Sequence, residues 1–317
     1  MASVARMAFS CNRVMSSPLG SKASEPSPTG ASDAGNAHLA FMVMRTRRMV
    51  LEHARIGDMQ GLREIWNNGG TTLGGWVSLA SPVTAEVTAR AGFDYVCIDT
   101  QHGAVEYSDV VAMIPAIELG GGRPIARAPW NEPGIIGKLL DAGAHGVIIP
   151  MVNTVEEAQA AVRACRYAPH GARSSGPTLV QMRTDRPYFD WAHDNVACIP
   201  MIETVQAVEN IDAILAVPGI DAIYVGPSDL SITLGLGPGN HDESAAFTDA
   251  LDLISAACAR AGVVAGIHST GALTPDRLRR GYRMVTATGD LQAMKFGLST
   301  ELAQARGESS GAESSMY

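Results

Sequence analysis

Two carboxylates lie near the ends of two consecutive strand-like runs. Glu203 closes the run CIPMIE, and Asp229 follows the run AIYVG within the turn GPSDL. Adjacent parallel strands would bring the two acids together at one face of a sheet, where two like charges need a cation or a shared proton. Oxygen ligands with open positions suit Mg²⁺, Mn²⁺ or Co²⁺. The alternative interpretation is that each acid only caps the helix that follows it.

Two further strand-like runs carry the other groups that such chemistry needs. YVCIDTQHG ends in Asp99 and His102, and RPIARA contains Arg127. His102 can serve as a general base if a carboxylate fixes its orientation. A buried guanidinium needs an anionic partner, which is either a permanent structural ion pair or a substrate whose enolate oxygen it stabilises. The amides of Ser228 and Asp229 would offer an anion site for a substrate carboxylate. These residues predict chemistry on an oxo acid held by a divalent cation.

Eight short β-branched runs alternate with longer helical patterns from Thr72 onward. The runs are 73–79, 95–99, 123–128, 146–152, 197–203, 222–226, 263–268 and 284–289. Eight β/α units in about 230 residues predict an α/β fold of the TIM (β/α)8 barrel type, whose active sites lie at the carboxyl ends of the strands. A doubly wound sheet is the alternative, but GxGxxG after the first strand is absent.

Composition limits the function classes. The formal net charge of −8 and the pI of about 5.5 argue against nucleic-acid binding. Five scattered cysteines predict reduced thiols, and no apolar stretch is long enough for a membrane span, so we expect a cytoplasmic protein.

The chain is expected to have three parts. The barrel is predicted over residues 58–303, between a disordered leader at 1–57 and a disordered tail at 304–317. The leader, rich in Ser, Pro, Gly and Ala, is either an overlong gene model or a transit peptide, and the second interpretation implies the mitochondrial matrix.

Long motifs over residues 62–300 resemble the HpcH/HpaI aldolase family, the metal-dependent class II pyruvate aldolases. They are GWVSLASP, GFDYVCIDTQHG, ARAPWNEPGIIGKLLDAGAHGVIIPMV, RYAPHGARSSGP, MIETVQAVEN and VGPSDLSITLG. The resemblance implies a TIM barrel that binds pyruvate through a divalent metal, forms its enolate, and adds the enolate to an aldehyde or reverses that step.

The resemblance also implies roles for individual residues. Glu203 and Asp229 would be the metal ligands. His102 would be the acid–base residue, acting with a water on the metal and supported by Asp99. Arg127 would clamp the substrate and its enolate.

Asp141 of the LLDAG segment would reach the active site of a neighbouring subunit, so a homo-oligomer, commonly a hexamer built as a trimer of dimers, is implied. Trp76 would line the pocket.

Two positions depart from expectation. Met201 replaces a Gln that family members often carry, so pyruvate binding would depend on Arg127, the metal and the GPSDL amides. His268, at the end of the seventh strand, would bind substrate, either tuning the aldehyde preference or shuttling a proton; a packed core histidine is the alternative.

Three functions remain open. The leading one is cleavage of a 4-hydroxy-2-oxo acid to pyruvate and an aldehyde; the same enolate also serves oxaloacetate decarboxylation or macrophomate-synthase-like chemistry. Schiff-base catalysis is disfavoured because Lys138 and Lys295 lie in predicted helices rather than at strand ends. A non-catalytic oxo-acid sensor or scaffold is disfavoured because all four strand-end groups are retained, and a scaffold has no need of an unpaired buried arginine at position 127.

Overall fold

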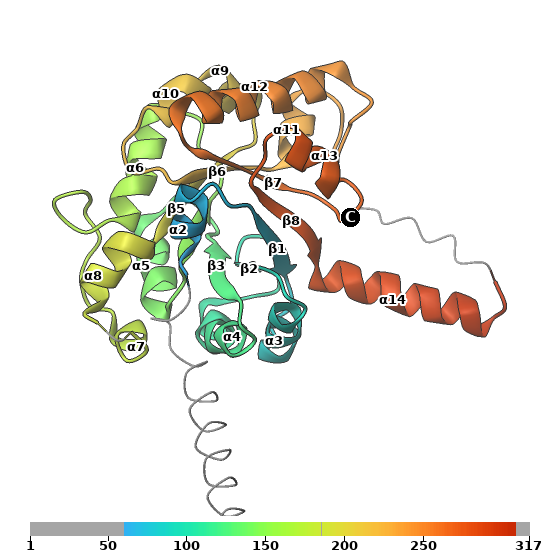
Figure 1. Ribbon diagram of the computed structural model, residues 1–317, viewed down its shortest axis with the longest axis horizontal. Helices are drawn as coiled ribbons and strands as arrows, with labels where there is room; N and C mark the ends of the chain where they lie inside the picture. Colours follow the sequence, from blue (N-terminus) through green and yellow to red (C-terminus); the bar gives the residue numbers. More distant parts are fainter. Residues whose placement is uncertain (1–59, 185, 309–317) are drawn as a thin grey trace, which may run out of the picture. The chain divides into compact units, whose positions relative to one another are not determined.

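The computed structural model describes residues 60–184 and 186–308. Eight parallel strands form a closed barrel in sequence order, with β8 paired to β1 (Figure 1). The predicted (β/α)8 fold is confirmed. The strands are β1 (Thr72–Val77), β2 (Tyr95–Asp99), β3 (Arg123–Arg127), β4 (Gly146–Ile149), β5 (Ala197–Ile202), β6 (Ala222–Val225), β7 (Val264–His268) and β8 (Met284–Gly289).

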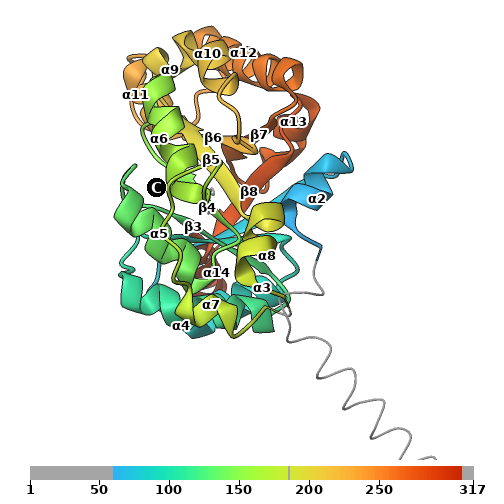
Figure 2. The same ribbon diagram turned by 90° about the vertical axis from the view of Figure 1, so that its left-hand side faces the viewer.

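Helices surround the barrel, as the view in Figure 2 shows. Their bounds are α2 (Leu62–Asn67), α3 (Pro82–Arg90), α4 (Tyr107–Leu119), α5 (Pro133–Ala142), α6 (Val155–Cys165), α7 (Thr178–Gln181), α8 (Tyr188–Asn195), α9 (Val205–Glu209), α10 (Ile211–Leu215), α11 (Pro227–Thr233), α12 (Ala245–Ala261), α13 (Thr274–Arg279) and α14 (Asp290–Ala305). Ser81, Thr154 and Thr204 each accept a hydrogen bond from the third amide of the helix that follows, which fixes where α3, α6 and α9 begin.

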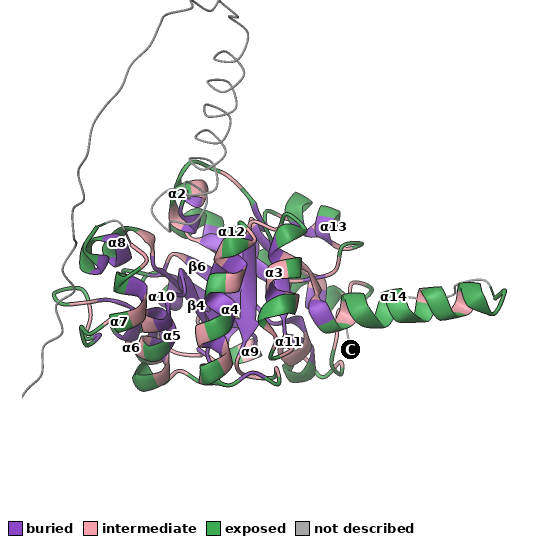
Figure 3. Cartoon of the chain, turned by 90° about the horizontal axis from the view of Figure 1, so that it is seen from below, coloured by how far each residue is buried: buried purple, intermediate pink, exposed green. Residues whose placement is uncertain are grey.

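Side chains alternate along the strands between two apolar clusters. One cluster fills the barrel interior and includes Trp76, Cys97, Ile125 and Met201. The other lies between the sheet and the helices (Figure 3). Most strand residues on both faces of the sheet are therefore buried, which explains why the runs are almost continuously apolar.

Helix α2 was not predicted. It belongs to the interior cluster through Leu62 and Trp66, and the indole N–H of Trp66 donates to the hydroxyl of Thr72 at 3.1 Å, at the start of β1. It therefore contributes to the amino-terminal end of the barrel interior, opposite the strand ends that carry the predicted site.

Helix α14 differs from the other helices. It leaves the end of β8 and extends away from the barrel (Figure 1), and Asp290 is its one buried residue. Exposed apolar side chains lie along it: Leu291, Met294, Phe296, Leu298 and Leu302. Its last residue, Ala305, lies two residues beyond the boundary expected for the barrel.

Several predictions concern residues outside the described ranges. The leader at 1–57 lies outside them, as do residues 309–317 of the tail. Within the described residues, no helix is long and apolar enough to cross a membrane. The four cysteines that the structure describes are buried and free.

Candidate active site

A cavity of about 580 Å³ opens at the carboxyl ends of the strands. Its lining is Trp76, Ser78, Asp99, His102, Arg127, Met201, Glu203, Tyr224, Gly226, Pro227, Ser228, Asp229, Pro238, His268, Gly289, Asp290, Leu291, Gln292 and Lys295. Every site residue predicted from the sequence is in this lining except Asp141.

The alternation of the strands explains the convergence of these side chains. Cys97 belongs to the barrel interior, so Asp99, two residues later, points the same way. The same two-residue step leads from Ile125 to Arg127 and from Met201 to Glu203. Strands β2, β3 and β5 thus each add one polar side chain to the top of an apolar interior.

Asp99 is the most connected residue of the cavity. Arg127 donates to both carboxylate oxygens, from Nε at 2.9 Å and from Nη2 at 2.5 Å. The indole N–H of Trp76 donates at 3.2 Å, and the backbone amides of Gln101 and His102 donate at 3.0 and 3.2 Å. Burial raises the pKa of Asp99, but the hydrogen bonds and charge of Arg127 outweigh that effect and lower it. Asp99 is therefore an anion that fixes this side of the cavity.

This pairing corrects one sequence argument. Arg127 is not unpaired, because Asp99 lies opposite it in the β2–β3 register and holds two of its nitrogens. The case against a non-catalytic scaffold therefore cannot rest on an unpaired arginine. Asp99 also contacts His102 through the backbone amide, which orients the loop that carries the imidazole.

Glu203 is the first residue after β5, and its carboxylate is only 2% exposed. Its Oε1 accepts a hydrogen bond from the amide of Met151 at 2.7 Å. Met151 has a φ of 55°, a conformation that residues other than glycine rarely adopt. A Cβ on Gly226 would lie 2.4 Å from Glu203 Oε2, so this position needs a glycine for the carboxylate to fit.

The pKa of Glu203 indicates whether a cation fits at this site. Burial raises the pKa of Glu203 to about 7 and outweighs the hydrogen bond from Met151, which lowers it; the charge of Asp229 raises it further, and the charge of Arg127 has a smaller lowering effect. Arg127 is already paired with Asp99. The buried carboxylate of Glu203 beside the half-buried carboxylate of Asp229 forms a donor set that suits a hard divalent cation, because a cation would offset the cost of ionising Glu203.

The chain supplies few ligands. Among the described residues, no group of three or more His, Cys, Asp or Glu side chains is placed to hold a metal ion. A cation at Glu203 and Asp229 would therefore take its remaining ligands from water and substrate oxygens, which is how Mg²⁺ is usually bound.

The other predicted residues occupy distinct parts of the cavity. His102 is an exposed residue of its lining, and Asp229 lies in the first turn of α11. The hydroxyl of Ser228 is buried and has no hydrogen-bond partner among the described residues. Asp141 lies outside the cavity, on α5, where it accepts a hydrogen bond from Arg173 at 2.6 Å. Its role toward a neighbouring subunit stays a prediction.

Sequence reasoning missed several residues of the cavity lining, among them one lysine, one aspartate and one tyrosine. Lys295 and Asp290 come from α14, and Tyr224 comes from the barrel interior. Asp290 accepts hydrogen bonds from the amides of Ser78 and Leu79, which ties the start of α14 to the end of β1. Tyr224 could have been found from the sequence, because it stands on β6 two residues before Gly226, just as Cys97 stands on β2 two residues before Asp99. The path of α14, which brings Asp290 and Lys295 to the cavity, could not be read from the sequence pattern.

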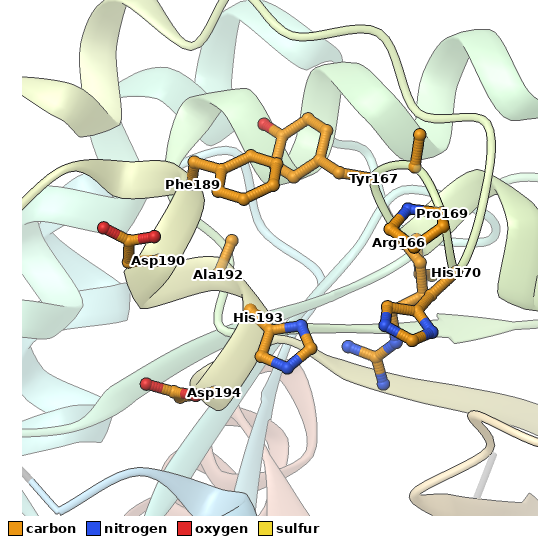
Figure 4. Close-up of a pocket in the computed structure, with 11 residues that line it drawn as sticks. Arg166, Tyr167, Pro169, His170, Phe189, Asp190, Ala192, His193 and Asp194 are labelled. Carbon is orange, nitrogen blue, oxygen red and sulfur yellow. The ribbon is translucent and has the colours of Figure 1, made fainter.

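A second cavity, of about 440 Å³, lies near the segment that leads into β5 and contains none of the predicted residues. Tyr167 and Phe189 stack on one side of it, and His170 faces His193 on another (Figure 4). It lies at the amino end of a strand, the end of a (β/α)8 barrel that generally serves stability rather than catalysis.

The barrel and its carboxylate-lined cavity define a (β/α)8 enzyme. The family model of HpcH/HpaI aldolase/citrate lyase matches residues 72–294. A hydroxypyruvate/pyruvate aldolase from Rhizorhabdus wittichii is 40% identical over 249 residues, which cover 78% of this chain and 99% of the relative. The chain belongs to the HpcH/HpaI aldolase/citrate lyase family and is a carbon–carbon lyase.

Solved structures agree with this assignment. A family member from Burkholderia cenocepacia superimposes with a TM-score of 0.72 at 30% identity, covering 77% of this chain and 98% of the other. Macrophomate synthase superimposes with a TM-score of 0.71 at 29% identity, covering 78% and 89%.

Proposed function

We propose that the protein catalyses the reversible cleavage of a 4-hydroxy-2-oxo acid to a 2-oxo acid and an aldehyde, with Mg²⁺, Mn²⁺ or Co²⁺ held by Glu203 and Asp229. The observation that carries this proposal is the carboxylate pair at the top of the barrel, in the same cavity as His102 and Arg127. Pyruvate and hydroxypyruvate are both candidate 2-oxo acids, since the R. wittichii relative is named for both.

A bound divalent cation would polarise the 2-oxo group and draw electrons toward its oxygen. His102 would accept the proton of the C4 hydroxyl through a water molecule. The C3–C4 bond then breaks, the aldehyde forms, and the electron pair moves to give an enolate. The N–H groups of Arg127 not used by Asp99 would stabilise the enolate oxygen, and proton return to C3 yields the 2-oxo acid.

Removing the metal with a chelator separates this proposal from Schiff-base catalysis. The test is needed because Lys295 is part of the cavity lining. We expect EDTA to abolish aldol cleavage, Mn²⁺ to restore it, and borohydride with pyruvate to leave the protein unmodified. The Lys295→Ala variant should still cleave substrate. Activity that survives the chelator and is lost on borohydride trapping would overturn the proposal.

A second candidate uses the same enolate for oxaloacetate decarboxylation or for addition to a larger electrophile. The similarity to macrophomate synthase supports it. Pyruvate release from oxaloacetate and from several 4-hydroxy-2-oxo acids should be compared in one preparation. A much larger kcat/KM for oxaloacetate would place decarboxylation first.

We also propose that the protein works as a homo-oligomer, with the hexamer expected from the family resemblance. The exposed apolar side chains of α14 support an intersubunit contact. Light scattering should give a mass that is a multiple of the 33.3 kDa chain, and Phe296→Asp with Leu298→Asp should reduce it. A monomer at all concentrations would contradict this.

A further inference from the structure

A chain of hydroxyl groups crosses the interior of the barrel and ends at a histidine of the cavity. The hydroxyl of Tyr95 lies 3.0 Å from that of Thr286, which lies 2.6 Å from that of Tyr224. The hydroxyl of Tyr224 lies 3.4 Å from Nδ1 of His268. Gly74 makes room for this arrangement, because a Cβ there would lie 2.1 Å from the ring of Tyr95.

The direction of these hydrogen bonds follows from counting protons. Burial raises the pKa of Tyr95 and of Tyr224, so both keep their protons. Each of the three hydroxyls has one proton to donate, and an unsatisfied donor in a dry interior is costly. Every proton along these three contacts finds an acceptor when Tyr95 donates to Thr286, Thr286 to Tyr224, and Tyr224 to Nδ1 of His268.

This direction assigns the tautomer of His268. With Nδ1 accepting, a neutral imidazole carries its proton on Nε2. Burial lowers the pKa of His268 to about 4, and the charge of Arg127 acts the same way, so the ring is neutral at physiological pH. Nδ1 contacts Tyr224 of the barrel interior, whereas Nε2 is not among the buried atoms of the described residues that have no partner, so it opens toward the cavity that His268 lines.

Trp76 contacts both Arg127 and His268. The guanidinium of Arg127 lies 5.0 Å from the centre of the Trp76 ring, and the His268 ring meets the same indole edge-on at 4.9 Å. A substrate whose C2 oxygen is near Arg127 would carry its C3 group toward His268. Lys295 and Leu291, from α14, line another part of the same cavity.

We propose that the Nε2–H of His268 donates a hydrogen bond to a hydroxyl on C3 of the 2-oxo acid, so that the enzyme prefers 3-hydroxy-2-oxo acids such as hydroxypyruvate to pyruvate. This rests on the proposed function for its kinetic consequence. A methyl group at C3 leaves the donor without a partner on the substrate, which disfavours pyruvate.

Binding and kinetics test the preference. The wild-type protein with Mn²⁺ should bind hydroxypyruvate about tenfold more tightly than pyruvate by calorimetry, and the ratio of their kcat/KM values should favour hydroxypyruvate equally. His268→Phe keeps an aromatic ring but removes the donor, and should bring both ratios close to one. His170→Phe, at an exposed position, is the matched control and should leave them unchanged.

The tautomer is tested independently of turnover by ¹⁵N NMR of histidine-labelled protein. The His268 signals, identified by their loss in His268→Phe, should show the proton on Nε2, and Tyr224→Phe should give a mixture of tautomers. A proton on Nδ1 in the wild-type protein would overturn the inference. The inference would also be overturned if His268→Phe left the hydroxypyruvate-to-pyruvate ratios unchanged. The same holds if the substitution changed only the preference between aldehydes with and without a 2-hydroxyl group. Failure of the proposed aldol reaction can be told apart from failure of this inference, because the tautomer of His268 and the two binding constants are measured without any turnover.

Discussion

Replacing Glu203 by Gln is expected to abolish Mn²⁺ binding and to lower aldol turnover at least about 100-fold, since losses of that size already follow changes to residues that only support a metal ligand. The wild-type pKa of about 7 has a further consequence. Below pH 7 a proton competes with the cation for the carboxylate, so wild-type Mn²⁺ affinity should fall as pH drops from 8 to 6. Calorimetry across this range measures both effects.

Two variants sharpen this experiment. Glu209→Gln removes an exposed carboxylate of α9 and should behave as wild type. Gly226→Ala keeps both acids but forces Glu203 to move, so it should also weaken Mn²⁺ binding, whereas Gly137→Ala, where nothing lies within 4 Å, should not. If pyruvate binds tightly to Glu203→Gln and also to Asp229→Ala, the protein is an oxo-acid sensor rather than a metal-dependent aldolase.

His102→Ala is expected to lower kcat for aldol cleavage by about 10²- to 10⁴-fold while Mn²⁺ and pyruvate still bind, because a general base contributes that much through proton transfer alone. Steady-state kinetics with calorimetry on the same preparation measures the two separately. His193→Ala, which lies by the second cavity, is the control. Near wild-type turnover in His102→Ala would remove this residue from the proposed mechanism.

The fold and most of the cavity lining could be predicted because both follow from local pattern. Almost continuously apolar runs predict strands buried on both faces, and a polar residue two positions after an interior residue extends into the top of the barrel. That rule leads to Asp99, Arg127 and Glu203 without any knowledge of side-chain contacts.

The same rule does not predict which side chains of neighbouring strands contact each other. The pairing of Asp99 with Arg127 depends on the β2–β3 register, which a sequence pattern does not specify. The predicted fourth strand ran to residue 152, but β4 ends at Ile149, and the positive φ of Met151 turns its amide toward Glu203. Nothing in the residue type of a methionine indicates that backbone conformation.

Helix α14 connects the mouth of the cavity with an exposed apolar surface that lies farther along the same helix. Its first turns supply Leu291, Gln292 and Lys295 to the mouth of the cavity, and exposed apolar side chains continue beyond them to Leu302. If the protein is the proposed homo-oligomer, its dilution would free this helix to move and would therefore reshape the entrance of the cavity. Substrate range and protein concentration would then be coupled variables in an assay.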